Sequence, residues 1–342
     1  MKFRILIVGH GSIGKRHLRI ARELLPTSKI LVMRHQPTQV IPELADYVTA
    51  SLDDAISFKP HIAIIATPAP FHLETAKILA ESNCHLLIEK PIAAQSHGLK
   101  EFLAYAHQSQ LVCQVGYNLR FLPSLAEYRR LIRSGAIGQP LSIHCEMGQY
   151  LPDWRPGTNY RQGVSARKEL GGGVILELSH ELDYLYWIFG PVNWVSAWAG
   201  QLSDLEIDVE DSAFLTLGFA STKAGRETVA SVNLDFVRRD TTRTCLVIGS
   251  TGSLRWNGLA GTVEEYREVC AGWETVFSQY QEQDESYRNQ FDQFLSCIKS
   301  GQSPLVDGDA GLAVLQIIEA AKQSIDLGGL RQKVVKIQRR KG

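Results

Sequence analysis

The chain has 342 residues, of which 44% are hydrophobic and 21% are charged. That length favours two domains over a single core. The 36 Lys and Arg residues balance 36 Asp and Glu residues, so the formal net charge is zero, and neither nucleic acid nor a membrane is predicted as a partner. No run approaches the ~20 apolar residues that span a bilayer. The apolar run Ile5 to Val8 is too short for a signal peptide and fits a first strand.

The cysteine pattern bears on compartment and metal binding. The sequence contains six cysteines, Cys84, Cys113, Cys145, Cys245, Cys270 and Cys297. They are scattered, and no pair has the Cys-x-x-Cys spacing of a metal or redox site. We therefore expect buried thiols in a reducing compartment, a cytoplasmic location and no metal site.

The first 121 residues alternate short apolar runs with helical patterns. The predicted strands are Ile5 to Val8, Ile30 to Met33, Ile62 to Ala66, His85 to Ile88 and Leu111 to Val115. Runs that are apolar throughout suit strands covered by helices on both faces. The pattern predicts a Rossmann-type domain over residues 1–121, which is an α/β fold with a doubly wound parallel sheet.

The rhythm changes in residues 122–342. A helix is predicted over Leu125 to Ser134, and the following run, Leu141 to Gly148, alternates apolar with polar residues like a half-buried strand. Further predicted strands are Trp194 to Ala199, Ala213 to Phe219, Thr228 to Phe236, Thr244 to Ile248 and Ser253 to Trp256. Closely spaced strands indicate an α+β domain with a largely antiparallel open sheet, and a helix over Ala310 to Ile325 closes the chain.

One strand of this second domain has two different faces. In Thr228 to Phe236, the apolar side chains Val232 and Leu234 alternate with Ser231 and Asn233. One face of the sheet is therefore expected to be solvated or to form a polar interface.

A glycine-rich loop follows the first predicted strand. Gly9, Gly11 and Gly14, with Ser12 and Ile13 between them, form the pattern Gly-x-Gly-x-x-Gly directly before a helical segment. In dinucleotide-binding folds, the first glycine permits the turn, the second lets backbone approach the pyrophosphate, and the third allows close helix packing. The helix N-terminus then attracts the phosphates. The strand before the loop and the helix after it favour dinucleotide binding over a simple turn.

The end of the second predicted strand bears on cofactor choice. NAD-specific domains usually place a carboxylate there, whereas this chain has Arg34 followed by His35, and no acid appears before Glu43. We expect NADP to bind at least as well as NAD, with Lys15 or Arg16 adding positive charge. If Arg34 instead points into solvent or stacks on adenine, the site would accept both cofactors.

The fourth predicted strand ends in Glu89, Lys90 and Pro91. Ligands bind at the carboxyl ends of strands in doubly wound sheets. Pro91 biases Lys90 towards an extended conformation, in which its side chain can leave the strand end towards a cofactor. Alone, this triplet would more often be an exposed loop.

The order of short motifs along nearly the whole chain resembles the glucose-fructose oxidoreductase and inositol dehydrogenase family. The motifs are the glycine loop, Thr67 and Pro68 before His72, Glu89-Lys90-Pro91, and the glycines of residues 171–173 ahead of His180 and Asp183. The resemblance implies an NAD(P)-dependent oxidoreductase for sugars, inositols or sugar nucleotides. It also implies a homo-oligomer, a dimer or tetramer, joined through the open sheet.

Carried over by position, the resemblance assigns roles to individual residues. It makes Lys90 a catalytic and substrate-orienting lysine, His180 the general acid/base and Asp183 its polar partner. Asn118 and Arg120 would lie near the nicotinamide and the substrate. The residues that would lie along the cofactor, besides Lys90, are Thr67, Pro68, His72 and Glu89.

The sequence departs from the family pattern at one position. Many family dehydrogenases carry an Asp four residues before the catalytic His, whereas Leu176 stands there and the nearest acid is Glu177. On a helix, Glu177 lies three residues before His180 and Asp183 three after, so both can share its face. Whether Glu177 replaces the missing Asp stays open.

The proposed chemistry also follows from the residue types. Oxidation of a secondary alcohol needs a base, a positive group beside the developing alkoxide and a nicotinamide that accepts hydride. An imidazole such as His180 can be the base, and Lys90 supplies the charge. The alternative for His180 is a core histidine bonded to Asp183.

A polar, aromatic-rich stretch containing Trp154, Arg155 and Tyr160 follows. Aromatic faces bind sugar CH surfaces and Arg binds carboxylate or phosphate, which suggests an anionic substrate such as a sugar acid or nucleotide sugar. For any single residue here, a surface loop that packs its Trp on the sheet is an equal alternative. Two other functions stay open, a non-catalytic cofactor-sensing regulator and an NAD-dependent glycosidase or lyase with transient oxidation.

Overall fold

The computed structural model describes residues 2–220, 227–267 and 272–335. The chain divides into two compact units, one comprising Met1–Asn118 and Asp284–Leu315, the other Leu119–Gln283 and Gln316–Gly342. The sequence predicted a domain boundary after residue 121, which lies near the division after Asn118. That boundary placed residues 284–315 in the second domain, whereas they belong to the first unit. As a statement about separate domains, that boundary stays a prediction.

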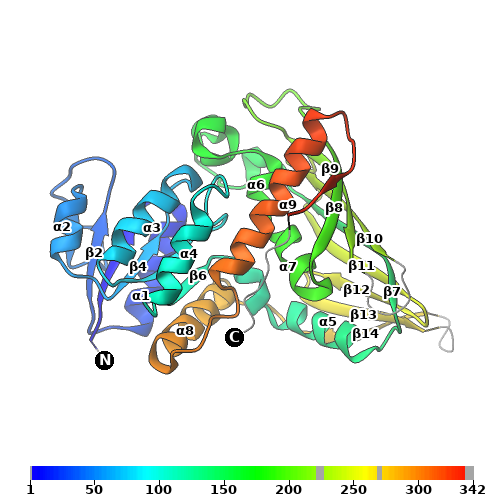
Figure 1. Cartoon of the computed structure of the whole chain (residues 1–342), viewed down its shortest axis with the longest axis horizontal. Helices are drawn as coiled ribbons and strands as arrows, with labels where there is room; N and C mark the ends of the chain where they lie inside the picture. The colour runs from blue at the N-terminus through cyan, green and yellow to red at the C-terminus, as the bar shows by residue number, and fades with distance from the viewer. Residues whose placement is uncertain (1, 221–226, 268–271, 336–342) are drawn as a thin grey trace. The chain divides into compact units, whose positions relative to one another are not determined.

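The first unit is built on a six-stranded parallel sheet with the order β3-β2-β1-β4-β5-β6. Its strands are β1 (Arg4–Val8), β2 (Lys29–Met33), β3 (Tyr47–Thr49), β4 (Ile62–Ile65), β5 (His85–Ile88) and β6 (Cys113–Val115). Its helices are α1 (Ser12–Leu24), α2 (Leu52–Ser57), α3 (His72–Glu81), α4 (Leu99–Gln108) and α8 (Glu285–Ser300). Figure 1 shows the N-terminal part of this unit in blue and cyan and its helix α8 in orange. This is the predicted Rossmann sheet, with β3 as an addition.

The core of this unit joins segments from both ends of the sequence. Ile5, Ile7 and Leu18 pack in one buried cluster with Phe291 and Phe294 of α8. Burying a phenylalanine side chain contributes about 1.5–3 kcal/mol. Helix α8 is therefore an integral part of the first unit, although almost 170 residues separate it from β6 in the sequence.

The second unit contains a nine-stranded sheet with the order β14-β13-β12-β11-β7-β10-β9-β8-β15. Its strands are β7 (Pro140–Gly148), β8 (Val192–Gly200), β9 (Ser212–Phe219), β10 (Thr228–Asp235), β11 (Thr242–Gly249), β12 (Ser253–Asn257), β13 (Thr262–Arg267), β14 (Gly272–Ser278) and β15 (Gln332–Lys333). Among the described strands of this sheet, only β7 and β10 pair in parallel, so the predicted, largely antiparallel sheet is confirmed. The helices include α5 (Pro123–Ser134), α6 (Val174–Glu177) and α7 (His180–Phe189), and the division between the units falls within α9 (Gly308–Asp326).

The two faces of this sheet differ as the alternation in β10 predicts. Val232 and Leu234 are buried, whereas Asn233 is only half-buried. The register places Phe214 of β9 beside Asn233 and Trp198 of β8 beside Phe214. Trp198 and Phe214 are 47% and 49% exposed, so the outer face carries an aromatic area next to polar residues.

Three further expectations concern thiols, membranes and metal ions. Five cysteines are buried free thiols, and Cys270 lies outside the described residues. Among those residues, no helix is long and apolar enough to cross a membrane. Within the same ranges, no group of three or more His, Cys, Asp or Glu side chains is placed to hold a metal ion.

Candidate cofactor and catalytic site

The glycine loop lies between β1 and α1 in the geometry that its sequence predicts. Gly9 has a φ of +96°, and a Cβ there would lie 2.7 Å from the carbonyl oxygen of Ala66. A Cβ on Gly14 would lie 2.1 Å from the carbonyl oxygen of Gly9, whereas a Cβ on Gly11 would meet no atom within 4 Å. Gly9 and Gly14 therefore permit close packing, and Gly11 leaves the space beside the loop open.

The N-terminus of α1 is suited to an anion. Gly11 is the N-cap residue and supplies no side-chain cap, and the first turn contains no acidic residue. The first amide groups of a helix lack intrahelical acceptors, and the helix dipole is positive at this end. The exposed Ser12 and half-buried Ile13 stand at this terminus. A pyrophosphate fits these features.

Three basic residues gather beside this loop. The pKa of His10 is lowered by burial and by the positive charges of Arg34 and Lys15. Arg34 is half-buried and His35 exposed. Neither Arg34 nor Lys15 forms an ion pair with a carboxylate in the described part of the chain.

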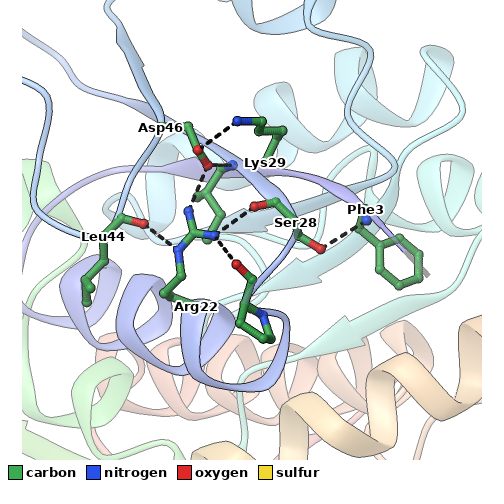
Figure 2. A network of polar contacts seen from close by, with 8 residues as sticks. Phe3, Arg22, Ser28, Lys29, Leu44 and Asp46 are labelled. Carbon is green, nitrogen blue, oxygen red and sulfur yellow. Dashed lines mark hydrogen bonds and ion pairs between the residues drawn. The ribbon is translucent and has the colours of Figure 1, made fainter.

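The segment that follows Arg34 is anchored to the end of α1 (Figure 2). Arg22 donates hydrogen bonds to the carbonyl oxygen of Leu44 at 3.0 Å, to that of Ser28 at 2.8 Å, and to Asp46 Oδ2 at 2.8 Å. Lys29 adds an ion pair to Asp46 at 3.2 Å. This network fixes the segment between Arg34 and β3, to which Leu44 and Asp46 belong.

The side chain of His72 contacts the turn that follows β4. It is buried, and its ring nitrogens lie 2.7 Å from the carbonyl oxygen of Thr67 and 2.9 Å from that of Pro91. Burial lowers the pKa of His72, and the two backbone hydrogen bonds act in the opposite direction. His72 therefore ties the Thr67-Pro68 turn to the segment after β5, and both of its ring nitrogens are used within the protein.

Thr67 offers an observation that points to a ligand. Its hydroxyl oxygen is buried and has no hydrogen-bond partner among the described residues. A buried hydroxyl without a partner is costly unless a ligand or water satisfies it. Thr67 also lies beside the glycine loop, because a Cβ on Gly9 would approach its backbone nitrogen to 3.1 Å. The loop, the helix terminus and this hydroxyl together fit a dinucleotide.

Glu89 and Lys90 follow β5, and their surroundings differ. Glu89 is buried, with its Oε1 2.7 Å from Nε2 of His17 and its Oε2 accepting the backbone N–H of Lys90 at 3.2 Å. Lys90 is half-buried, and its bond to Pro91 is cis. Burial acts to raise the pKa of Glu89, but the hydrogen bond and charge of His17 and the charge of Lys90 outweigh it and lower the pKa.

Asn118 and Arg120 belong to different units. The buried Asn118 donates a hydrogen bond to the Ser286 hydroxyl at 2.7 Å within the first unit. Arg120, in the second unit, is 4% exposed and binds Asp183 with two hydrogen bonds, from Nε to Oδ2 at 2.9 Å and from Nη2 to Oδ1 at 2.6 Å. The structure thus gives Asp183 an arginine partner that the sequence did not indicate.

His180 is the first residue of α7, and it is half-buried. Leu176 is buried at the position where an Asp was expected, and Glu177 accepts a hydrogen bond from the Ser165 hydroxyl at 2.8 Å. The turn before α6 is shaped by Glu210, whose carboxylate lies 3.3 Å from the backbone nitrogen of Ile175. Burial raises the pKa of Glu210.

Glu210 was not identified from the sequence. Gly173 has a φ of +103°, and a Cβ there would lie 2.4 Å from Glu210 Oε1. The last glycine of residues 171–173 therefore both adopts a left-handed conformation and makes room for a carboxylate. The glycines were visible in the sequence, but their partner 37 residues later was not.

The aromatic-rich stretch is largely engaged within the second unit. The indole nitrogen of Trp154 donates to the carbonyl oxygen of Gln149 at 3.0 Å, and its ring packs edge-on against Phe236 at 5.1 Å. The Tyr160 hydroxyl accepts the backbone N–H of Glu206 at 3.4 Å. Arg155 is exposed. These contacts favour the packed-loop alternative for Trp154, and its substrate role stays a prediction.

Two family models match the chain, one in its N-terminal part and one in its C-terminal part. An oxidoreductase family with an NAD-binding Rossmann fold matches residues 3–117, and the GFO/IDH/MocA C-terminal domain matches residues 125–255. The chain belongs to the Gfo/Idh/MocA family of oxidoreductases. As a Gfo/Idh/MocA protein it is an NAD-binding oxidoreductase, which confirms the resemblance stated from its motifs.

Individual relatives are more distant. The chain is 26% identical over 339 residues to the uncharacterized oxidoreductase YrbE of Bacillus subtilis (strain 168), with 94% of each chain covered. Among solved structures, a levoglucosan dehydrogenase in complex with NADH and levoglucosan superposes with a TM-score of 0.85 at 20% identity, covering 98% of this chain and 100% of that one. The WlbA dehydrogenase from Bordetella pertussis, in complex with NADH and UDP-GlcNAcA, has a TM-score of 0.79 at 21% identity, with coverages of 98% and 100%. At these identities the structures establish the fold.

Proposed function

We propose that this Gfo/Idh/MocA protein is an NAD(P)-dependent dehydrogenase that oxidises a secondary alcohol of a sugar-type substrate, or runs the reverse reduction. The observation that carries the proposal is Lys90 at the carboxyl end of β5, in the same unit as the glycine loop and the unsatisfied Thr67 hydroxyl. A cation there serves an oxidoreductase better than a purely cofactor-binding module, because it can stabilise an alkoxide.

In the proposed reaction, each catalytic residue has one task. His180 accepts the hydroxyl proton of the substrate, and Lys90 stabilises the negative charge that develops on the oxygen. When bound, the nicotinamide supplies the hydride acceptor. Asp183, which is bound by Arg120, holds in place the helix that begins at His180. It does not accept a proton itself.

The substrate is proposed to be a sugar, and an anionic one in particular. Arg155 is exposed and extends from the stretch that also contains Tyr160. The levoglucosan and UDP-GlcNAcA complexes of the two structural relatives are consistent with carbohydrate chemistry on this fold. Anionic character rests on Arg155 alone, because a guanidinium binds carboxylate or phosphate with a fork of donors.

NADP is proposed as a cofactor at least as good as NAD. The two structural relatives contain NADH. In this chain, however, Lys15 and Arg34 supply positive charge beside His10, and neither has a carboxylate partner among the described residues. A 2′-phosphate would gain charge-assisted hydrogen bonds there.

Self-association and compartment complete the proposal. The outer sheet face with Trp198 and Phe214 is proposed to join copies of the chain into a dimer or tetramer, because exposed aromatic areas beside polar residues suit an interface. A cytoplasmic location is proposed from the five free thiols.

The test is a spectrophotometric assay of the purified protein with NAD or NADP and a panel containing levoglucosan, myo-inositol and UDP-GlcNAcA. The proposal predicts net formation of reduced nicotinamide with at least one member. Substrate turnover without net reduced cofactor would favour the glycosidase or lyase alternative. Tight cofactor binding without any turnover across a broad panel of sugars would favour the regulator.

A further inference from the structure

The carboxylate of Glu89 is enclosed within the first unit. Its two oxygens have separate partners, with Oε1 at 2.7 Å from His17 Nε2 and Oε2 at 3.2 Å from the backbone nitrogen of Lys90. The Glu89 side chain is 9% exposed and the His17 side chain 1%. Both oxygens are thus used by the protein, one by helix α1 and one by the residue proposed to act in catalysis.

The space for this carboxylate is reserved by a glycine. A Cβ on Gly116, just after β6, would lie 2.7 Å from Glu89 Oε2 and 3.0 Å from the Glu89 Cα. Real Cβ atoms do not approach other atoms this closely, so residue 116 has to lack a side chain for Glu89 to keep its position. The backbone nitrogen of Gly116 also donates to the Ile88 carbonyl at 2.7 Å, which holds the two strand ends together.

Helix α8 covers the other side of the pair. The ring of Tyr287 packs edge-on against His17 at 5.9 Å, and the guanidinium of Arg16 lies 4.8 Å from the Tyr287 ring centroid. Arg16 in turn forms an ion pair with Asp284 at 2.8 Å. His17 therefore cannot turn away from Glu89 without disturbing the packing of α8 on α1.

The hydrogen-bond pattern fixes the direction of donation. Because Glu89 is an acceptor, Nε2 of His17 carries the proton in this contact. Nδ1 of His17 is buried and has no hydrogen-bond partner among the described residues. The ring thus uses one donor, directed at Glu89, and a glutamine at position 17 could supply the same donor.

We propose that Glu89 and His17 are positioning residues that hold the backbone of Lys90 in place, and that Glu89 is not a cofactor ligand. The catalytic part of this proposal rests on the proposed dehydrogenase function. The contact between Glu89 and the Lys90 backbone does not rest on it, because that contact can be measured without a substrate. Lys90 keeps its direct role in the reaction, and the pair acts only through it.

The experiment compares Glu89→Gln, His17→Leu and His17→Gln with wild type, with Glu23→Gln as the control. Glu23 lies on the same helix as His17, but it is 46% exposed and forms a surface ion pair with Arg288. Four quantities are measured: the melting temperature, the Kd of NAD and of NADP, the deuterium exchange of the Lys90 amide in peptides spanning residues 86–92, and kcat with whichever sugar of the panel is turned over.

The proposal predicts a specific pattern across these variants. In Glu89→Gln and His17→Leu, exchange at Lys90 should become about tenfold faster, because a glutamine side chain has only one neutral oxygen for the two donors that Glu89 binds, and His17→Leu removes the group that holds the carboxylate in place. The kcat should fall roughly tenfold to a hundredfold, as a small misplacement of a catalytic group does. The cofactor Kd should change less than about threefold, a small shift on the affinity scale. His17→Gln should restore both exchange and kcat, and Glu23→Gln should change neither.

Two results would overturn the proposal. One is a cofactor Kd that rises tenfold in Glu89→Gln while Lys90 exchange stays at the wild-type rate, which would make Glu89 a cofactor ligand. The other is a His17→Gln variant that matches His17→Leu in exchange and kcat at an unchanged melting temperature. If wild type turns over no sugar, the proposed function fails, and exchange with the cofactor Kd still decides the role of Glu89.

Discussion

Removing Arg120 should lower the stability of the fold, because it leaves the buried carboxylate of Asp183 without a counter-charge. Asp183 has no exposed surface, and both of its oxygens are bound by Arg120 at 2.9 and 2.6 Å. In Arg120→Leu the carboxylate keeps its burial and loses its counter-charge. Breaking a buried pair in this way costs about 3–5 kcal/mol. For a unit of 150–250 residues, that corresponds to a melting temperature lower by roughly 6–20 °C.

The assay is urea and thermal unfolding of wild type, Arg120→Leu, Asp183→Leu and the double variant. Replacing the whole pair by apolar side chains is often neutral, so the double variant should be more stable than Arg120→Leu. This non-additivity is the coupling that a double-mutant cycle measures.

The deficit of Arg120→Leu should also depend on pH. Burial raises the pKa of Asp183, and Arg120 opposes that shift, so the variant should have a still higher folded-state pKa. A carboxyl group with a folded-state pKa above its unfolded value destabilises the fold as pH rises through that range. The deficit should therefore be largest at neutral pH and shrink towards pH 4. A loss below about 1 kcal/mol, or a double variant as unstable as the sum of the two single ones, would refute this account of the pair.

Three further predictions concern the proposed activity and assembly. Lys90→Ala and His180→Ala should each lower turnover by roughly 100-fold or more with much smaller changes in cofactor Kd, and near-normal turnover in both would remove them from catalysis. Arg34→Asp should weaken NADP relative to NAD by about tenfold or more in fluorescence titrations, and wild type preferring NAD tenfold would contradict the role given to Arg34. Phe214→Glu should shift the molecular mass in light scattering towards the monomer, whereas a wild-type protein that is already monomeric at micromolar concentration would count against the interface.

Local patterns predicted most of the fold. The five apolar runs became five of the six parallel strands, because fully buried strands are apolar throughout. Helix α8 was missed, although Tyr287, Phe291 and Phe294 have helical spacing and offered a signal. Strand β13 gave a weaker signal, since the charged Glu265 takes one of its buried positions. Short strands such as β15 depend on pairing with a neighbour, which no local pattern contains.

The candidate site shows a sharper limit of the same kind. The glycine loop and the Glu89-Lys90-Pro91 triplet were visible because each is contiguous in sequence. The partners that define their chemistry were not, since 72 residues separate His17 from Glu89 and 63 separate Arg120 from Asp183. Residue types identified which groups are reactive, but only the fold showed which of them are already bound.

This difference explains how neighbouring residues of one motif can have different tasks. Glu89 is directed towards His17 on α1, and the next residue, Lys90, is the half-buried one. Two groups of the first unit therefore bind the carboxylate of Glu89, the His17 ring and the Lys90 backbone, and the residue that follows it, Lys90, is the one proposed to stabilise the alkoxide.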